Sequence, residues 1–269
     1  MHIDSARRAA GAVAALGILL GSLTACGGTE PGPPPAAGAG PAAGEAVGRD
    51  LAGRDASRRG PVPEAGGPAG PAEAGTVTIP GVGGLLQRRI PATTGQVLVV
   101  YGEGRDSAES TVVFYTRHRD GWRPAGAWAA HNGRQGWTTD HHAGDERSPV
   151  GVFSLTDAGG ALPDPGTRLP YTHDTGAYAP PYAWDPAHLH DFDYVVAIDY
   201  NRVRGAPPHD RVRPWGGELG GGIWLHVDHG DGTAACVSVA EEVMEHLLRT
   251  LDPARHPVVI MGNREELLV

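Results

Sequence analysis

The N-terminal part of the chain cannot contribute a hydrophobic core. Residues 27–75 are mostly Gly, Ala, Pro, Arg and Glu, with almost no large apolar side chain. Such a segment cannot bury enough surface to offset the conformational entropy that ordering would cost. We therefore expect residues 26–75 to be a disordered, Pro/Gly/Ala-rich tether. The folded domain must then be built from residues 76–269.

The chain begins like a bacterial export signal. Arg7 and Arg8 precede the apolar run AAGAVAALGILLGSLTA, which is too short and too rich in Gly and Ala for a confident membrane span. The run ends in LTAC, which resembles the lipobox of bacterial lipoproteins. Residues 1–25 are thus predicted to be a lipoprotein signal peptide and Cys26 the lipidated residue. An ordinary secretory signal with an incidental cysteine is the alternative. We expect an extracytoplasmic protein, lipid-anchored to the outer face of the cytoplasmic membrane.

The charged residues exclude several kinds of chemistry. The formal net charge of −9 argues against a nucleic-acid partner held by phosphate contacts. All 22 basic residues are arginine, so Schiff-base lysines, Walker lysines and Ser-Lys dyads are ruled out.

The folded part is predicted to be mainly β. Runs of β-branched and aromatic residues separated by turn residues predict strands. A helix is predicted after Cys236, with Ser238 and Glu241 as a capping box and Pro253 as its end. Residues 157–193 are predicted to be a long loop, which we expect to act as a lid. The predicted strands are 96–102, 110–118, 151–155, 194–201, 222–227 and 256–262.

Cys236 and His226 are candidates for a catalytic pair. Cys236 lies two residues before the predicted helix cap, where the field of a helix N-terminus favours a thiolate. His226 ends a predicted strand, and the Gly-rich loop between them can fold back on itself. Thiol and imidazole together support covalent acyl transfer. His229 is an alternative base, and an unreactive core cysteine is the alternative for the whole pattern.

Three segments, in order, resemble the YkuD-type L,D-transpeptidases. They are GWTTDHHAGDERSPVGVFSL (136–155), YVVAIDYN (194–201), which is similar to an actinobacterial lipoprotein branch, and GIWLHV with TAACVSV (222–239). The resemblance implies an L,D-transpeptidase-like β-sandwich domain with one short helix after the catalytic cysteine. It also implies a metal-independent acyltransferase of cell-wall biogenesis without a cofactor. Such enzymes form 3–3 cross-links from peptidoglycan tetrapeptide stems through a thioester, or hydrolyse or exchange D-Ala.

The resemblance also implies a role for individual residues. Cys236 corresponds to the nucleophile and His226 to the general base and acid. The backbone carbonyl of Val227 would orient the histidine, and the N–H group of Ala235 would stabilise the oxyanion, together with that of Cys236. Three positions depart from the family pattern, since Ala235 replaces a glycine, Ser238 an arginine and Ser148 a threonine. An alanine is strained if its φ must be positive, and the lost arginine removes a cation for the substrate carboxylate.

Two other functions remain open. A non-catalytic peptidoglycan-binding lipoprotein with a degenerate site would fit the departures from the family pattern. A zinc-dependent cell-wall hydrolase would use the ligand-type residues in the segments 138–145, 188–193 and 226–231. On the main hypothesis no metal is expected. The partners are peptidoglycan stem peptides and, through the lipid anchor, the membrane. We expect a monomer.

Overall fold

The computed structural model describes residues 77–269. The predictions for the signal peptide, Cys26 and the tether therefore lie outside the described residues. No helix among residues 77–269 is long and apolar enough to cross a membrane.

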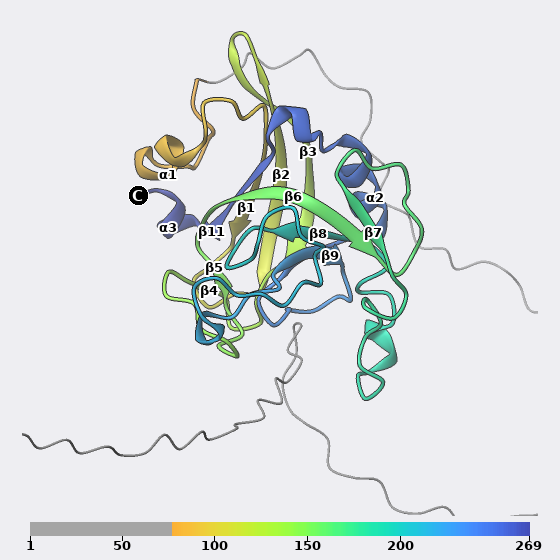
Figure 1. Cartoon of the computed structure of the whole chain (residues 1–269). Coiled ribbons are helices and arrows are strands. Elements are labelled where there is room, and N and C mark those ends of the chain that lie inside the picture. Colours follow the sequence, from red (N-terminus) through yellow and green to blue (C-terminus); the bar gives the residue numbers. More distant parts are fainter. Residues whose placement is uncertain (1–76) are drawn as a thin grey trace, which may run out of the picture.

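The described residues form a mainly β domain with short helices (Figure 1). The strands are β1 (Gln96–Gly102), β2 (Glu109–His118), β3 (Gly121–His131), β4 (Trp137–Thr138), β5 (Ser148–Pro149), β6 (Gly151–Gly160), β7 (Tyr171–His173), β8 (Val195–Ile198), β9 (Trp224–Val227), β10 (Val237–Val239) and β11 (Val258–Asn263). The helices are α1 (Gly84–Arg89), α2 (Glu241–Thr250) and α3 (Arg264–Leu267), with 3₁₀ turns η1 (Pro186–His188), η2 (Gly217–Leu219) and η3 (Pro253–Arg255). The predicted fold class is confirmed.

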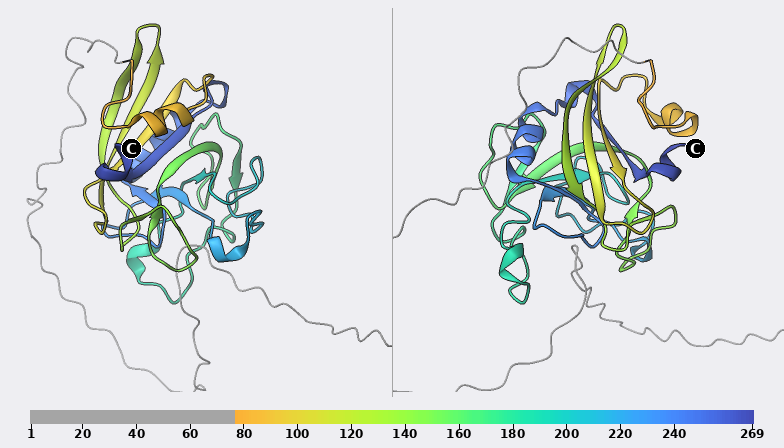
Figure 2. Two further views of the ribbon diagram at one scale, coloured as in Figure 1. Left: turned by 90° about the vertical axis from the view of Figure 1, so that its left-hand side faces the viewer. Right: turned by 180° about the vertical axis from the view of Figure 1, so that it is seen from behind.

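Nine strands form one sheet that closes on itself. Their order is β11-β1-β2-β3-β10-β9-β8-β6-β7, and β6 pairs with β11 as well as with β8. Figure 2 shows the resulting curved sheet from two further sides. Most neighbours are antiparallel, but β9 and β10 run parallel. Because β10 also pairs with β3, the segment that follows Cys236 lies between two strands of the sheet.

Strand β1 separates two hydrophobic cores. All seven of its residues are buried, and alternate residues of a strand point to opposite faces. Leu98 and Val100 belong to the larger core, which α2 covers through Met244 and Leu247. Val97 and its alternate neighbours belong to a second core with residues of α1 and α3. Figure 1 shows α1 and α3 together on one side of the sheet and α2 on the other.

The predicted capping box at the start of the helix is wrong. Ser238 lies in β10, and α2 begins at Glu241 after Ala240, which makes no side-chain cap hydrogen bond. The Ser238 hydroxyl donates instead to Asp228 Oδ1 at 2.6 Å. Pairing with β3 and β9 keeps residues 237–239 extended, so tertiary strand pairing overrides the local helix signal.

The predicted loop 157–193 contains regular structure at its start. Strand β6 continues to Gly160, and β7 pairs with this extension. A Cβ on Gly159 would lie 2.3 Å from Tyr178 Oη, and one on Gly160 2.1 Å from the Asp193 carbonyl oxygen. Glycines there are required by close packing and do not mark the end of a strand.

Candidate active site

Strand pairing places Cys236 and His226 on the same face of the sheet. In the parallel β9–β10 ladder, Ser238 lies opposite His226. Cys236 precedes Ser238 by two residues, so both side chains point to one side of the sheet. Cys236 is therefore level with Trp224, whose backbone N–H donates to Cys236 Sγ at 3.4 Å. Cys236 and His226 therefore lie on neighbouring strands, offset from each other by two residues along the strand direction.

His226 has the tautomer that a general base needs. Its Nδ1 lies 2.8 Å from the carbonyl oxygen of Val227. A carbonyl can only accept a hydrogen bond, so Nδ1 carries the proton, and in the neutral ring Nε2 keeps its lone pair. Burial lowers the pKa of His226, against the opposing effect of Asp191. The neutral, proton-accepting form is therefore favoured.

Cys236 is fully buried in an aromatic cluster. Its neighbours there include Trp224, together with Tyr178 and Phe192 from the predicted lid segment. Nucleophilic attack by Cys236 requires its thiol in the reduced form. The expectation that Cys236 lies close to a helix N-terminus is wrong, because β10 intervenes before α2. The field of a helix terminus falls off within its first turn, so it does not activate this thiol.

The segment that carries Cys236 is held by two hydroxyl groups. Thr233 Oγ1 donates to the carbonyl oxygen of Cys236 at 2.7 Å. Ser148 Oγ lies 2.7 Å from the carbonyl oxygen of Ala235 and 3.1 Å from that of Cys236. Ser148 Oγ also accepts a hydrogen bond from the backbone N–H of Gly133 at 2.9 Å. Sequence reasoning noted Ser148 only as part of a family-like segment and missed this role.

Replacing Ser148 with Ala is expected to destabilise the domain. The change leaves the buried N–H of Gly133 without its acceptor and removes the donor to the Cys236 segment. An unsatisfied buried group costs about 1–3 kcal/mol, which urea unfolding can measure. Ser148→Thr keeps the hydroxyl and should lose clearly less. Equal losses in the two variants would show that volume, and not hydrogen bonding, matters at this position.

Ala235 carries no left-handed backbone strain. Among residues 77–269, the non-glycine residues with positive φ are Glu146, Asn201 and His256. The backbone strain that an alanine with positive φ would carry is therefore absent at position 235.

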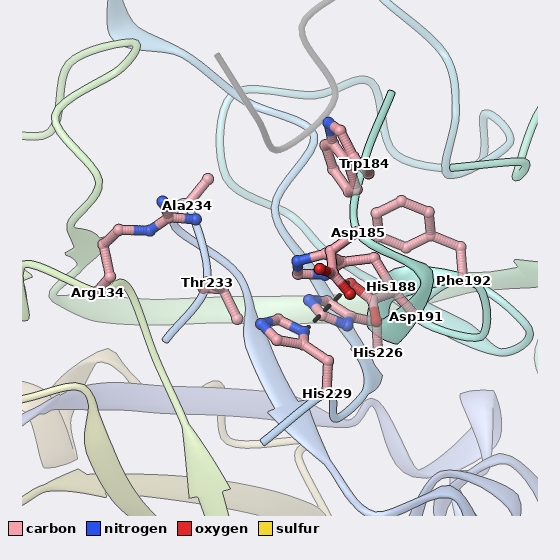
Figure 3. Close-up of a pocket in the computed structure, with 10 residues that line it drawn as sticks. All are labelled: Arg134, Trp184, Asp185, His188, Asp191, Phe192, His226, His229, Thr233 and Ala234. Atoms are coloured by element: carbon pink, nitrogen blue, oxygen red, sulfur yellow. Dashed lines mark hydrogen bonds and ion pairs between the residues drawn. The ribbon is translucent and has the colours of Figure 1, made fainter. Parts of the chain in front are cut away.

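A cavity of about 220 Å³ opens beside His226 (Figure 3). Three loops contribute to its wall, one around η1, one between β9 and β10 and one between β3 and β4. Cys236 itself does not line this cavity, but its segment does through Thr233 and Ala234. The lining residues are Arg134, Trp184, Asp185, His188, Asp191, Phe192, His226, His229, Thr233 and Ala234.

Two of the three His/Asp segments meet in this cavity. Residues His188 and Asp191 come from segment 188–193, and His229 from segment 226–231. His229 Nδ1 lies 3.2 Å from Asp191 Oδ2, and its ring stacks parallel to that of His226 with centroids 6.3 Å apart. Segment 138–145 contributes no residue to the cavity lining. Sequence reasoning flagged these residues by type but did not predict that Asp191 lies beside His226.

Arg134 is the one arginine among the residues that line the cavity. Its guanidinium is half exposed and lies 3.5 Å from Glu146. In Figure 3 it lies across the cavity from His188 and Asp191. Ser238, which occupies the position of the family arginine, is turned to Asp228 instead. Arg134 can therefore offer a cation to an anionic ligand in the cavity.

Comparisons with known proteins agree with the resemblance in the sequence. Residues 86–260 match the family YkuD, the L,D-transpeptidase catalytic domain. No curated protein matches the chain. A solved structure described as "Structure of Bdellovibrio bacteriovorus Bd1075" is similar at 16% identity and a TM-score of 0.35, covering 62% of this chain and 47% of that one. This chain thus spans about half the length of that protein, and the likeness is too distant to bear on the site.

Proposed function

We propose that this chain, which belongs to the YkuD family of L,D-transpeptidase catalytic domains, is a cysteine-dependent L,D-transpeptidase acting on peptidoglycan tetrapeptide stems. One observation carries the proposal. The β9–β10 ladder sets Cys236 and His226 on one face, and the Val227 carbonyl holds the histidine with Nε2 able to accept a proton. A thiol on the same face of the sheet as an oriented neutral imidazole is suited to covalent acyl transfer.

In the first half-reaction the reduced Cys236 is acylated. His226 Nε2 takes the thiol proton, and the sulfur attacks the carbonyl carbon between the third stem residue and D-Ala. The N–H groups of Ala235 and Cys236 stabilise the oxyanion of the tetrahedral intermediate. The C–N bond then breaks, His226 returns the proton to the departing amine, and D-Ala leaves. The product is a thioester between Cys236 and the third residue.

In the second half-reaction an acceptor resolves the thioester. An amine of a neighbouring stem attacks the thioester carbonyl while His226 takes its proton. The C–S bond breaks, and the proton returns to the sulfur. The product is a 3–3 cross-link. Water as acceptor gives a shortened stem, and a D-amino acid gives exchange.

Substrate access requires movement of the segment that covers Cys236. The thiol is fully buried, and Tyr178 and Phe192 of the 157–193 segment pack in the cluster around it. We propose that this segment is a lid. Tyr182 is fully exposed, so limited proteolysis can cut the chain there. Cleavage that leaves the rate of thioester formation unchanged would contradict the lid.

The protein is proposed to act outside the cytoplasmic membrane as a lipoprotein. This proposal rests on the export signal and the LTAC sequence at residues 23–26. The variant Cys26→Ser should release the protein from the membrane fraction.

Intact-mass measurement of the full chain tests the function. In the presence of a reductant, incubation with a tetrapeptide stem should add the mass of the tripeptide acyl group and release D-Ala. The variant Cys236→Ala should give neither. A zinc hydrolase would release D-Ala from Cys236→Ala and lose activity with a chelator. A binding-only lipoprotein would bind sacculi without releasing D-Ala.

Replacing Arg134 with Gln is expected to weaken use of the stem peptide. If Arg134 binds a stem carboxylate, its loss removes a charge-assisted hydrogen bond worth about 1.5–3 kcal/mol. The second-order rate constant of thioester formation should fall about 10–100-fold, with KM rising more than kcat falls. Arg123→Gln is the matched control, because Arg123 pairs with Asp120 in the β2–β3 hairpin and does not line the cavity. Equal rates for both variants would remove Arg134 from the binding site.

A further inference from the structure

Three side chains in the wall of the cavity form a group that the transpeptidase reaction leaves unused. His188 is the last residue of η1, Asp191 follows it by three residues, and His229 lies in the β9–β10 loop. One ligand atom of each lies within 4.8 Å of the other two. Figure 3 shows the three side chains converging beside His226. We propose that His188, Asp191 and His229 bind a divalent transition-metal ion of the zinc class.

The distances suit a shared ion. Asp191 Oδ2 lies 2.9 Å from His188 Nδ1 and 3.2 Å from His229 Nδ1. Around a tetrahedral Zn²⁺ with bonds of about 2.0–2.2 Å, ligand atoms lie roughly 3.3–3.5 Å apart. The carboxylate oxygen of Asp191 therefore needs to move only a few tenths of an ångström from each nitrogen to admit the ion.

The state of His229 is a second, independent indication. Its side chain is only 7% exposed. Its Nδ1 is buried and, among residues 77–269, has no partner in hydrogen-bond geometry, although the carboxylate of Asp191 is near. A buried ring nitrogen without a hydrogen bond costs free energy. A metal ion between the nitrogen and the carboxylate would give His229 Nδ1 the partner that it lacks.

The backbone holds the ligands in place without the ion. The i,i+3 spacing of His188 and Asp191 in a 3₁₀-like turn puts both side chains on one side. The N–H of Val227 donates to the carbonyl oxygen of Asp191 at 3.0 Å, which joins the lid segment to the end of β9. The two halves of the proposed site are thus connected before metal binds.

The donor set selects the kind of ion. Two imidazoles and one carboxylate suit Zn²⁺ and similar transition metals, whereas Mg²⁺ and Ca²⁺ prefer oxygen ligands. Three protein ligands leave a fourth position for water or a substrate oxygen. Neither Cys236 nor His226 belongs to the group, so the metal site is independent of the proposed nucleophile and base. A bound metal ion would cross-link the lid segment to the β9–β10 loop.

Metal binding to the full chain tests the proposal. The variant Cys236→Ser serves as the background, so that no thiol at position 236 can bind the metal. Titration should show one saturable Zn²⁺ site, a tetrahedral Co²⁺ absorption spectrum and a rise in Tm with Zn²⁺ but not with Mg²⁺. Loss of even an outer-shell partner typically costs about 10–100-fold in metal affinity. His188→Ala and His229→Ala should therefore weaken Zn²⁺ binding at least about tenfold.

The lid segment contains a matched control. His190 pairs with Asp193 at 2.8 Å with the same i,i+3 spacing, but it is 77% exposed, and among residues 77–269 no third ligand lies nearby. His190→Ala should bind Zn²⁺ like the background protein. No saturable Zn²⁺ binding, or equal affinity in His188→Ala and His190→Ala, would overturn the proposal. His188 is partly exposed, so its replacement tests the site even if His229→Ala fails to fold. Thioester formation in a chelator is measured separately, so failure of the metal site leaves the test of the nucleophile intact.

Discussion

Replacing His226 with Gln is expected to slow thioester formation by about 10²–10⁴-fold, the usual contribution of a general base. Glutamine is similar in size but cannot take the proton of the Cys236 thiol. The glutamine amide can still donate to the Val227 carbonyl oxygen that His226 Nδ1 contacts at 2.8 Å, which should leave the variant folded enough to assay. Rapid mixing with a tetrapeptide stem, quenching at set times and intact-mass measurement of the thioester adduct give the rate of acylation directly.

Two further variants test whether His226 or His229 is the base. His190→Gln changes a surface histidine outside the cavity and should acylate at the wild-type rate. His229→Gln alters the residue whose ring stacks on that of His226. If His229→Gln loses acylation while His226→Gln retains it, the base must be reassigned to His229.

Replacing Arg202 with Ala is expected to cost about 3–5 kcal/mol of stability, the range for breaking a buried ion pair. The Arg202 side chain is 3% exposed, and its partners Asp157 and Asp199 are 4% and 0% exposed. Its Nη1 donates to Asp157 Oδ2 at 3.0 Å and also to Asp199. The variant would leave the buried carboxylate of Asp157 without a cation and that of Asp199 with only the exposed Arg204. Urea unfolding should show a lower midpoint with little change in slope.

The neighbouring Arg204 provides the control for this measurement. It also pairs with Asp199, at 3.5 Å, but its side chain is 69% exposed. Because exposed ion pairs contribute about 0–1 kcal/mol, Arg204→Ala should change stability little. Similar midpoints for the two variants would show that the buried cluster does not stabilise the fold. The cluster joins β6, which carries Asp157, to the residues that follow β8.

Local patterns predicted the strands that are rich in β-branched residues. Strand β1 was predicted with its observed bounds, since its continuous apolar run suits a strand buried on both faces. Strand β3 was not predicted, because Pro124, Gly126 and several alanines weaken the strand signal. Its position is decided by pairing with β2 and β10, and the register shifts between Phe114 and Tyr115, opposite the irregular stretch.

In the candidate site, too, local sequence patterns predicted some features and tertiary contacts decided others. Residue type and the family-like segments singled out Cys236 and His226 as the candidate pair. They could not reveal the hydroxyl of Ser148, which reaches the Cys236 segment across a sequence separation of 88 residues. Nor could they place Asp191 against His229, because that contact depends on how the lid segment folds over the β9–β10 loop.

The sequence by itself determined the family and the mainly β class, and it named the candidate Cys/His pair. These follow from local composition, from the period of two along strands and from short segments that keep their order. The tertiary structure decided that Ser238 belongs to a strand, that Ala235 is unstrained and that two imidazoles and a carboxylate converge beside His226. Each of these depends on contacts between segments distant in the chain, and such contacts arise only when the sheet closes and its cores pack.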